Sequence, residues 1–329
     1  MKPECNITEE ELQRAKQIID RMLDYYGRKV VGQKRLGASL LVAMMANGHI
    51  LLESVPGLAK TTAAKVMTEA VNGIFSRIQC TPDLIPSDII GTQTYNASTN
   101  TFENKLGPVY GNFILLDEVN RSSAKTQSAM LEAMQERSVT IGGETFKMPE
   151  VFVVIATQNP VEQEGTYVLS EAQMDRFLLK VELDYPSKEE EILILERIEQ
   201  GVFNEIEQVA TIEDIIFLQN TCRKVFIDKS VKKYITDIVD ATRNVDKVID
   251  PNLAQYVTMG ASTRASIAFM DTAKAMALIN GRYYCVPEDV KVMRHSVLRH
   301  RIMLNFAALA DGIQEETIID EIVNSVKTP

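Results

Sequence analysis

One short stretch of this chain, residues 49–62, most constrains its fold. His49-Ile50-Leu51-Leu52-Glu53 predicts a short apolar strand, and the residues from Thr61 to about Asn72 predict a helix. Between them lies the loop Ser54-Val55-Pro56-Gly57-Leu58-Ala59-Lys60. A strand that leads through such a loop into a helix N-terminus can form a phosphate cradle, because backbone N–H groups and the positive helix end meet the anion. A lysine adds a point charge there, and a threonine hydroxyl suits Mg²⁺.

The loop departs from the usual phosphate-binding pattern, G-x-x-x-x-G-K-[ST]. Ser54 stands at the first glycine position and Ala59 at the second, whereas Gly57, Lys60 and Thr61 keep the expected chemistry. Taken alone, the stretch fits a phosphate cradle and a plain strand–turn–helix equally well. Other parts of the chain have to distinguish the two.

The composition narrows the class of protein. The chain has 329 residues, of which 45% are hydrophobic and 24% charged, so it has room for two globular domains. Its net charge of −10 disfavours non-specific binding to nucleic acid. It has no run of 18 apolar residues and no apolar leader, and its four cysteines are widely scattered. We therefore expect a cytoplasmic protein with reduced thiols and no membrane insertion.

Residues 1–185 alternate between helical and strand patterns. This alternation predicts a parallel α/β sheet with helices on both faces. The expected strands lie at 50–53, 75–80, 113–118, 151–156 and 178–183. Two hairpins are expected near 92–104 and 139–147, the second around Gly142-Gly143.

The pattern changes at Tyr185-Pro186-Ser187, after which nearly every segment is helical. We therefore predict two domains, an α/β core over residues 1–185 and an all-helical domain over 186–329. The helices expected in the second domain lie at about 188–200, 211–222, 230–246, 263–280, 287–302 and 315–326.

Two acids follow the most sharply defined strand. Asp117 and Glu118 come directly after four apolar residues, at the carboxyl end of a strand, where ligands of parallel sheets bind. Asp117 could hold Mg²⁺ together with Thr61, and Glu118 could orient or deprotonate a water molecule. The alternative is a pair of solvated acids at a strand end. The buried strand before them and the Lys60-Thr61 pair favour the magnesium site.

Three further polar residues have a functional and a structural interpretation each. Asn159 ends the next strand, where it could contact a terminal phosphate or simply form a turn before Pro160. Arg176 could clamp a transferring phosphoryl group, in its own subunit or a neighbour, or form a surface ion pair. Arg264 follows a Ser/Thr helix cap and could reach the phosphates or remain an exposed first-turn arginine.

Taken together, these segments resemble the AAA+ ATPases and, within them, the MoxR family. The phosphate loop of that family reads G-V-P-G-L-A-K-T, so Ala59 is normal for it and Ser54 is the one departure. The resemblance covers nearly the whole chain, and the two hairpins match the helix-2 insert and the pre-sensor-1 hairpin. The other matching segments are Walker B at 113–121, sensor 1 at 156–160, the arginine-finger segment at 171–177 and sensor 2 at 260–264.

The resemblance implies the fold of a P-loop AAA+ core with a helical lid, and ATP hydrolysis at the subunit interfaces of a ring, usually a hexamer. It implies that Glu118 activates the water, Asn159 senses the γ-phosphate, Arg176 enters the neighbour's site and Arg264 couples the lid to the nucleotide. Thr61 and Asp117 would hold Mg²⁺. The residues that it places around ATP or ADP are Val31, Gly32, Gln33, Ser54, Val55, Pro56, Gly57, Leu58, Ala59, Lys60, Thr61, Thr62 and Asp117.

The same resemblance implies a chaperone-like motor that remodels or matures client proteins together with a von Willebrand A-type partner. Two other functions stay open. One is a nucleotide-gated scaffold that binds ATP with little turnover, against which Glu118 and Arg176 argue. The other is a nucleic-acid motor, which the acidic charge and the mostly uncharged first hairpin make the weaker alternative.

Overall fold

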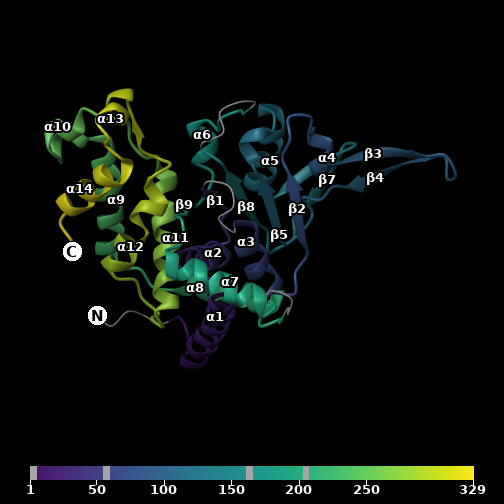
Figure 1. Cartoon of the computed structure of the whole chain (residues 1–329), viewed down its shortest axis with the longest axis horizontal. Coiled ribbons are helices and arrows are strands. Elements are labelled where there is room, and N and C mark those ends of the chain that lie inside the picture. The colour runs from purple at the N-terminus through teal and green to yellow at the C-terminus, as the bar shows by residue number, and fades with distance from the viewer. Residues whose placement is uncertain (1–5, 55–59, 161–165, 203–206) are drawn as a thin grey trace. The chain divides into compact units, whose positions relative to one another are not determined.

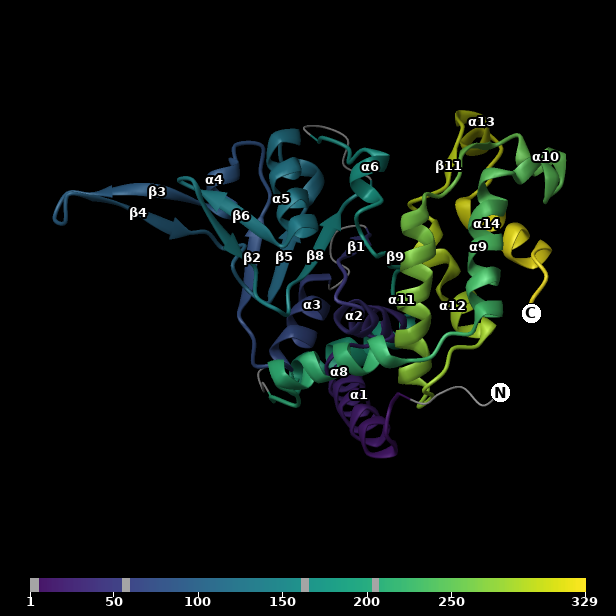
Figure 2. The same cartoon turned by 180° about the vertical axis from the view of Figure 1, so that it is seen from behind.

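We describe the protein from a computed structural model, drawn from two sides in Figures 1 and 2. The residues that it describes are 6–54, 60–160, 166–202 and 207–329. The chain forms two compact units, and each is described by itself. The sheet unit consists of Ile18–Arg176 and Val181–Ile216, and the helical unit consists of Met1–Gln17, Phe177–Lys180 and Phe217–Pro329.

These units do not coincide with the expected division at residue 185. The helix α7 (Lys188–Glu199) follows that position, yet it belongs to the sheet unit. Its Arg197 Nη1 donates a hydrogen bond to Gly27 O of α1 (Glu9–Lys29) over 3.1 Å. Further along, the backbone N–H of Ala210 donates to Ala70 O over 3.0 Å. Contacts with the core thus hold residues 181–216 to the sheet unit, a feature that helical periodicity cannot reveal.

The sheet unit is built on a five-stranded sheet in the order β2-β5-β8-β1-β9, as the alternating pattern predicts. The neighbouring pairs β2·β5, β5·β8 and β8·β1 are parallel. All five residues of β5 are buried, because this central strand is covered on both faces. The five strands are β1 (Ile50–Glu53), β2 (Phe75–Gln79), β5 (Phe113–Asp117), β8 (Val153–Gln158) and β9 (Leu179–Glu182).

Helices connect these strands. α3 contacts β2 and β5, and α2 contacts α3. The longer helices of this unit were predicted from helical patterns at 7–28, 34–47, 61–72, 122–136 and 188–200. The short α4, whose five residues follow a proline-containing turn, was not predicted. The helices of this unit, besides α1 and α7, are α2 (Lys34–Met45), α3 (Lys60–Glu69), α4 (Pro86–Ile90), the 3₁₀ turn η1 (Val119–Arg121), α5 (Ala124–Glu136) and α6 (Glu171–Met174).

Both predicted hairpins are present. β3 (Gly91–Asn96) pairs with β4 (Thr101–Leu106), and β6 (Ser138–Ile141) pairs with β7 (Glu144–Lys147), each as an antiparallel ribbon. Figures 1 and 2 show the β3–β4 hairpin extending away from the five-stranded sheet. At its base, Gly107 N–H donates to Ile90 O over 3.2 Å.

The helical unit buries its core between long helices, and α11 contacts both α9 and α12. It also carries a two-stranded antiparallel sheet, β10·β11, which the sequence analysis did not predict because each strand has only two or three residues. No helix in the described parts of the chain is long and apolar enough to cross a membrane. The elements from residue 212 onward are α8 (Ile212–Lys224), α9 (Lys229–Arg243), η3 (Val245–Lys247), α10 (Pro251–Ala254), β10 (Val257–Met259), α11 (Thr263–Ile279), α12 (Pro287–Leu298), β11 (Met303–Leu304), α13 (Phe306–Ala310) and α14 (Glu315–Ser325).

Candidate active site

Asp117 is the centre of the polar cluster at the carboxyl end of the sheet. It is the last residue of β5 and is 7% exposed. Its Oδ1 accepts a hydrogen bond from Thr157 Oγ1 over 2.8 Å. Its Oδ2 lies 3.3 Å from Thr61 Oγ1 and 2.6 Å from Arg77 Nη2. Side chains of β2, β8 and α3 therefore meet on this one carboxylate.

The surroundings of Asp117 favour its charged form. Burial by itself raises the pKa of the carboxyl group, because the charged form loses its water. The hydrogen bonds from Arg77 and Thr157, and the charge of Arg77, act in the opposite direction and prevail, so the pKa lies below its ordinary value of 3.8. At neutral pH the group is an anion that is already oriented for a cation.

Glu118 follows with an unusual backbone. Its φ of 57° and ψ of 53° place it in the left-handed region, which is uncommon for residues other than glycine and is often found at functional sites. Its N–H donates to Thr157 Oγ1 over 2.9 Å. Its Oε2 lies 3.0 Å from Gln79 Nε2 and 3.1 Å from Arg121 Nη1. The Glu118 carboxylate is therefore held by two donors, one from β2 and one from η1.

The structure describes the two ends of the expected phosphate loop, which are Ser54 and the residues from Lys60 onward. Lys60 begins α3, and its Nζ donates to Ser54 O over 2.9 Å. Both residues are buried. Thr61 and Thr62 continue the helix with half-buried side chains. The intervening predicted residues Val55, Pro56, Gly57, Leu58 and Ala59 lie outside the described residues.

Ser54 stands where the family pattern has glycine, and a glycine-like left-handed backbone would be strained there. The described non-glycine residues with positive φ are Asn47, Asn100, Glu118 and Arg137. Ser54 is not among them, so the serine causes no left-handed strain.

Asn159 lies immediately beyond β8 and is 3% exposed. Its carbonyl accepts a hydrogen bond from Asn120 Nδ2 over 3.2 Å, so the loops after β5 and β8 are joined beside Asp117. This contact ties Asn159 to the acid-bearing loop. It involves the backbone of Asn159, so the role of the Asn159 side chain stays a prediction.

The two predicted arginines, Arg176 and Arg264, are both exposed. Arg176 Nη1 donates to Leu131 O, at the longer distance of 3.3 Å. Arg264 lies in the first turn of α11, and its N–H donates to the Ser262 side chain, the helix cap that the sequence predicts. Arg264 belongs to the helical unit, so its role toward a nucleotide remains a proposal.

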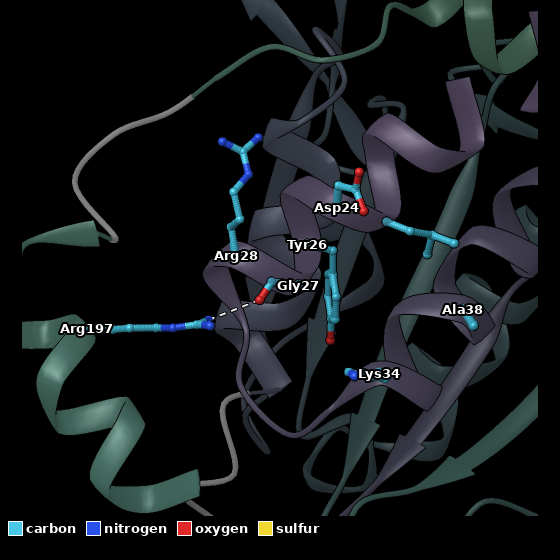
Figure 3. A pocket seen from close by; sticks show the side chains of 8 residues that line it. Asp24, Tyr26, Gly27, Arg28, Lys34, Ala38 and Arg197 are labelled. Carbon is cyan, nitrogen blue, oxygen red and sulfur yellow. Dashed lines mark hydrogen bonds between the residues drawn. The ribbon is translucent and has the colours of Figure 1, made fainter. Parts of the chain in front are cut away.

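The expected base-binding residues lie in the turn between α1 and α2. Val31 is buried, Gly32 has a φ of 74° that suits glycine, and Gln33 Nε2 donates to Asp184 O over 3.3 Å. A cavity of about 660 Å³ opens nearby, between α1, α2 and α7 (Figure 3). Its described lining contains none of the predicted nucleotide-binding residues, being formed by Leu23, Asp24, Tyr26, Gly27, Arg28, Lys34, Ala38 and Arg197.

The sequence analysis missed three residues that hold the acids. Thr157 lies within the predicted sensor-1 segment, 156–160, but the sequence analysis gave it no role; it is completely buried. Arg77 and Gln79 are two residues apart on β2, so their side chains share one face, and Gln79 lies opposite Asp117 in the register. The available signal was this spacing of two polar residues on a strand, but it becomes informative only once β2 and β5 are known to be neighbours.

The oxygen atoms present suit a magnesium ion. Mg²⁺ prefers oxygen ligands and is commonly held by one or two carboxylates together with substrate phosphates. The Asp117 carboxylate and the Thr61 hydroxyl already meet, and a buried lysine stands one residue before Thr61. A second carboxylate, that of Glu118, is next to them as a candidate proton acceptor.

Comparison with known proteins places this arrangement in a family context. The model of the ATPase family associated with various cellular activities (AAA) matches residues 49–179, and the AAA lid domain model matches residues 251–322. The chain is 45% identical to Chaperone MoxR1 of Mycobacterium tuberculosis over 94% of this chain and 82% of that protein. It is 44% identical to the uncharacterized protein YeaC of Bacillus subtilis, over 95% of each. A crystal structure of a protein from Cytophaga hutchinsonii matches with a TM-score of 0.91 and 46% identity, over 98% of both chains.

Proposed function

The chain belongs to the MoxR family of AAA+ ATPases, and from this premise we propose that it hydrolyses ATP to ADP and phosphate to remodel or mature client proteins. The observation that carries the proposal is the meeting of Thr61, Asp117 and Thr157 beside Glu118. Two solvated acids at a strand end would not be expected to have hydrogen bonds to a fully buried threonine, whereas Asp117 and Glu118 both bond to Thr157.

Each residue of the cluster has a role in the proposed reaction. Lys60 would bind the phosphates, and Thr61 and Asp117 would hold Mg²⁺, which when bound neutralises phosphate charge. Thr157 keeps the Asp117 carboxylate in place through its 2.8 Å hydrogen bond. Thr61 and Asp117 thus already lie together before any nucleotide arrives.

Glu118 would accept a proton from the attacking water. Gln79 and Arg121 both contact its Oε2 atom, and the carboxylate can accept a further hydrogen bond from the water. Asn159, held beside the acids by Asn120, would contact the γ-phosphate. Arg264 would report the nucleotide state to the helical lid.

We propose a ring, usually a hexamer in this family, in which Arg176 completes the site of the neighbouring subunit. The exposure of Arg176 supports this role, because its guanidinium is accessible from outside its own chain. An arginine supplied in this way stabilises negative charge that develops during phosphoryl transfer.

The proposed client is a protein, and the proposed helper is a von Willebrand A-type protein. The similarity to a mycobacterial protein that is named a chaperone supports the first part. The β3–β4 hairpin supports it as well: Tyr95 and Phe102 are 54% and 68% exposed, with ring centroids 5.3 Å apart. An exposed aromatic pair suits contact with another polypeptide.

The experiment that tests this function uses Glu118→Gln. We expect the variant to bind ATP and to lose about a hundredfold or more of the turnover rate, as for loss of a general base. Glu132→Gln, an exposed acid on α5 of the same unit, is the matched control and should hydrolyse ATP normally. Proteins that co-purify with ATP-loaded Glu118→Gln but not with the exposed-acid control are the candidate clients.

Turnover of the wild-type chain should be measured over a range of protein concentrations, because ring formation depends on concentration. No turnover at any concentration would contradict the motor and leave the nucleotide-gated scaffold. Strong stimulation by added DNA or RNA would instead identify a nucleic-acid motor.

A further inference from the structure

A positive charge already lies on the proposed metal ligand. Arg77 Nη2 is 2.6 Å and Arg77 Nε is 3.2 Å from Asp117 Oδ2. The Thr61 hydroxyl approaches the same oxygen, over 3.3 Å. The Thr61 hydroxyl and the Arg77 guanidinium therefore both contact the same atom, Oδ2 of Asp117.

The Arg77 guanidinium and a divalent cation would repel each other if both were bound to Asp117 Oδ2. Mg²⁺ binds its oxygen ligands at about 2.0–2.1 Å. With the guanidinium nitrogen 2.6 Å from Oδ2, the two cations would be only a few ångströms apart and would repel each other. Binding of the metal to Oδ2 thus requires that either the Arg77 guanidinium or the Asp117 carboxylate move.

Arg77 is the partner that can move. Its side chain is 51% exposed, whereas that of Asp117 is 11% exposed and is fixed from the other side by Thr157. β2 is an edge strand of the sheet, so the arginine side chain borders solvent. Rotation of Arg77 about its own bonds frees Oδ2 without any change in β5 or β8.

We propose that Arg77 is a built-in competitor of Mg²⁺ at Asp117. In the absence of metal it neutralises and orients the carboxylate, and it leaves Oδ2 when the metal–nucleotide complex binds. The competition raises the Mg²⁺ concentration that nucleotide binding requires. This inference rests on the proposed nucleotide-binding function and concerns a residue to which that function assigns no task.

The test measures metal-dependent binding rather than turnover. A fluorescent ADP analogue is held at fixed concentration with the full-length protein, and Mg²⁺ is titrated. Arg77→Met keeps the apolar stem and removes the charge. We expect its half-saturating Mg²⁺ concentration to fall by about threefold to tenfold, the range for loss of one close competing charge. Affinity for the analogue in EDTA, where no metal competes, should change much less.

Two control variants isolate the charge at this position. Arg77→Lys retains a cation and should stay near the wild-type midpoint. Arg28→Met removes another exposed arginine of the sheet unit, one paired with Glu207 over 3.0 Å, and should leave the midpoint unchanged. Electron paramagnetic resonance with Mn²⁺ in place of Mg²⁺ gives the bound metal directly.

The outcomes separate this inference from the function on which it rests. If wild-type protein binds the analogue with a Mg²⁺ dependence that Arg77→Met leaves unchanged or shifts to higher concentration, the competitor role is wrong and the function stands. If wild-type protein binds no nucleotide with or without metal, both fail. Thermal unfolding of each variant shows that a changed midpoint is not caused by loss of structure.

Discussion

Thr157 Oγ1 donates a hydrogen bond to Asp117 Oδ1 over 2.8 Å, across the two neighbouring strands β8 and β5. The same hydroxyl accepts the backbone N–H of Glu118 over 2.9 Å. The completely buried side chain of Thr157 thus positions both acids of the candidate site, Asp117 and Glu118. Water cannot easily replace it, because the position is closed to solvent.

Replacing this threonine should therefore affect stability and activity together. Thr157→Val has nearly the same shape but leaves two buried polar partners unsatisfied. We expect the free energy of unfolding to fall by about 1–3 kcal/mol, and ATP turnover to fall as the Asp117 carboxylate loses its orientation. Urea unfolding and steady-state hydrolysis measure the two effects. Thr157→Ser retains the hydroxyl and should recover most of both, and equal losses in the two variants would contradict this role.

Lys60 and Arg176 should behave differently when mutated. Lys60→Ala removes the positive charge that begins α3, and we expect it to abolish nucleotide binding. Arg176→Ala leaves the nucleotide cradle intact and should bind normally but hydrolyse poorly. Equilibrium binding of a fluorescent nucleotide and a phosphate-release assay distinguish these outcomes. Retained affinity in Lys60→Ala would refute the cradle.

Mixing these two variants tests whether Arg176 acts on a neighbouring subunit. A mixed ring contains interfaces with an intact cradle on one side and an intact arginine on the other. Such interfaces should restore part of the hydrolysis that neither variant shows alone. Absence of any recovery in rings shown to contain both variants would argue against action between subunits.

His49 should make stability depend on pH. It lies just before β1, where its Nδ1 accepts Val154 N–H over 3.0 Å. Burial, assisted by the charge of Arg137, lowers the pKa of His49 from 6.5 to about 4. The stabilisation from neutral His49 is fully present above pH 6.5 and is lost as the pH falls through 4, because the unfolded chain takes up the proton first. The loss amounts to about 3 kcal/mol.

His49→Gln, which cannot be protonated in this range, provides the comparison. Urea unfolding at several pH values between 7 and 4 should give wild-type stability that falls more steeply than that of the variant. His300, which is also buried with a lowered pKa, contributes a slope of the same sign to both proteins. Parallel curves for the two proteins would show that His49 is protonated equally in the folded and unfolded chains.

Two adjacent glycines allow a matched test of the contact between the hairpins. Gly142 and Gly143 have φ values of 57° and 84°, so alanine costs backbone strain of about 1–2 kcal/mol at either position. A β-carbon on Gly142 would lie 2.3 Å from Gln93 Nε2 of the first hairpin, whereas one on Gly143 would have nothing within 4 Å. Gly142→Ala alone should therefore disturb the Gln93–Asn104 hydrogen bond, which spans 3.2 Å.

Hydrogen exchange of the backbone amides in β3 and β4 measures this disturbance. We expect faster exchange in Gly142→Ala than in Gly143→Ala, since only the former forces the first hairpin to adjust. Asn104 also donates to Glu144 Oε2 over 2.9 Å, which couples the two ribbons. Identical exchange in the two variants would mean that the ribbons move independently.

The fold was largely predictable because its signals are local. Apolar runs such as that of β5 give the buried strands, and Gly142-Gly143 gives the second hairpin. The short α4 and the β10·β11 pair were missed because each has too few residues to show a periodic pattern. Tertiary contacts decide the conformation of such short segments. The predicted chain division at residue 185 could not anticipate that residues 181–216 belong to the sheet unit, where Arg197 contacts α1 and Ala210 contacts Ala70.

The site was predictable only in part, for a related reason. Asp117, Glu118 and Asn159 follow strands, so topology alone brings them to one edge of the sheet. Thr157 and Arg77 act across strands, and such pairings depend on a strand order that periodicity does not contain. The left-handed backbone of Glu118 was likewise invisible, because glutamate does not ordinarily mark such a position.

The hydrogen bond from Gly107 N–H to Ile90 O has a consequence for how this protein can diversify. It brings the two ends of the segment 91–106 together, so the chain returns to the point from which it departed. We expect changes at the tip of that segment to leave the path of the strands that carry Asp117 and Thr157 unaltered, whereas changes at Asn104 also affect the second hairpin. The proposed contact of Tyr95 and Phe102 with a client can therefore be altered separately from the proposed ATP hydrolysis.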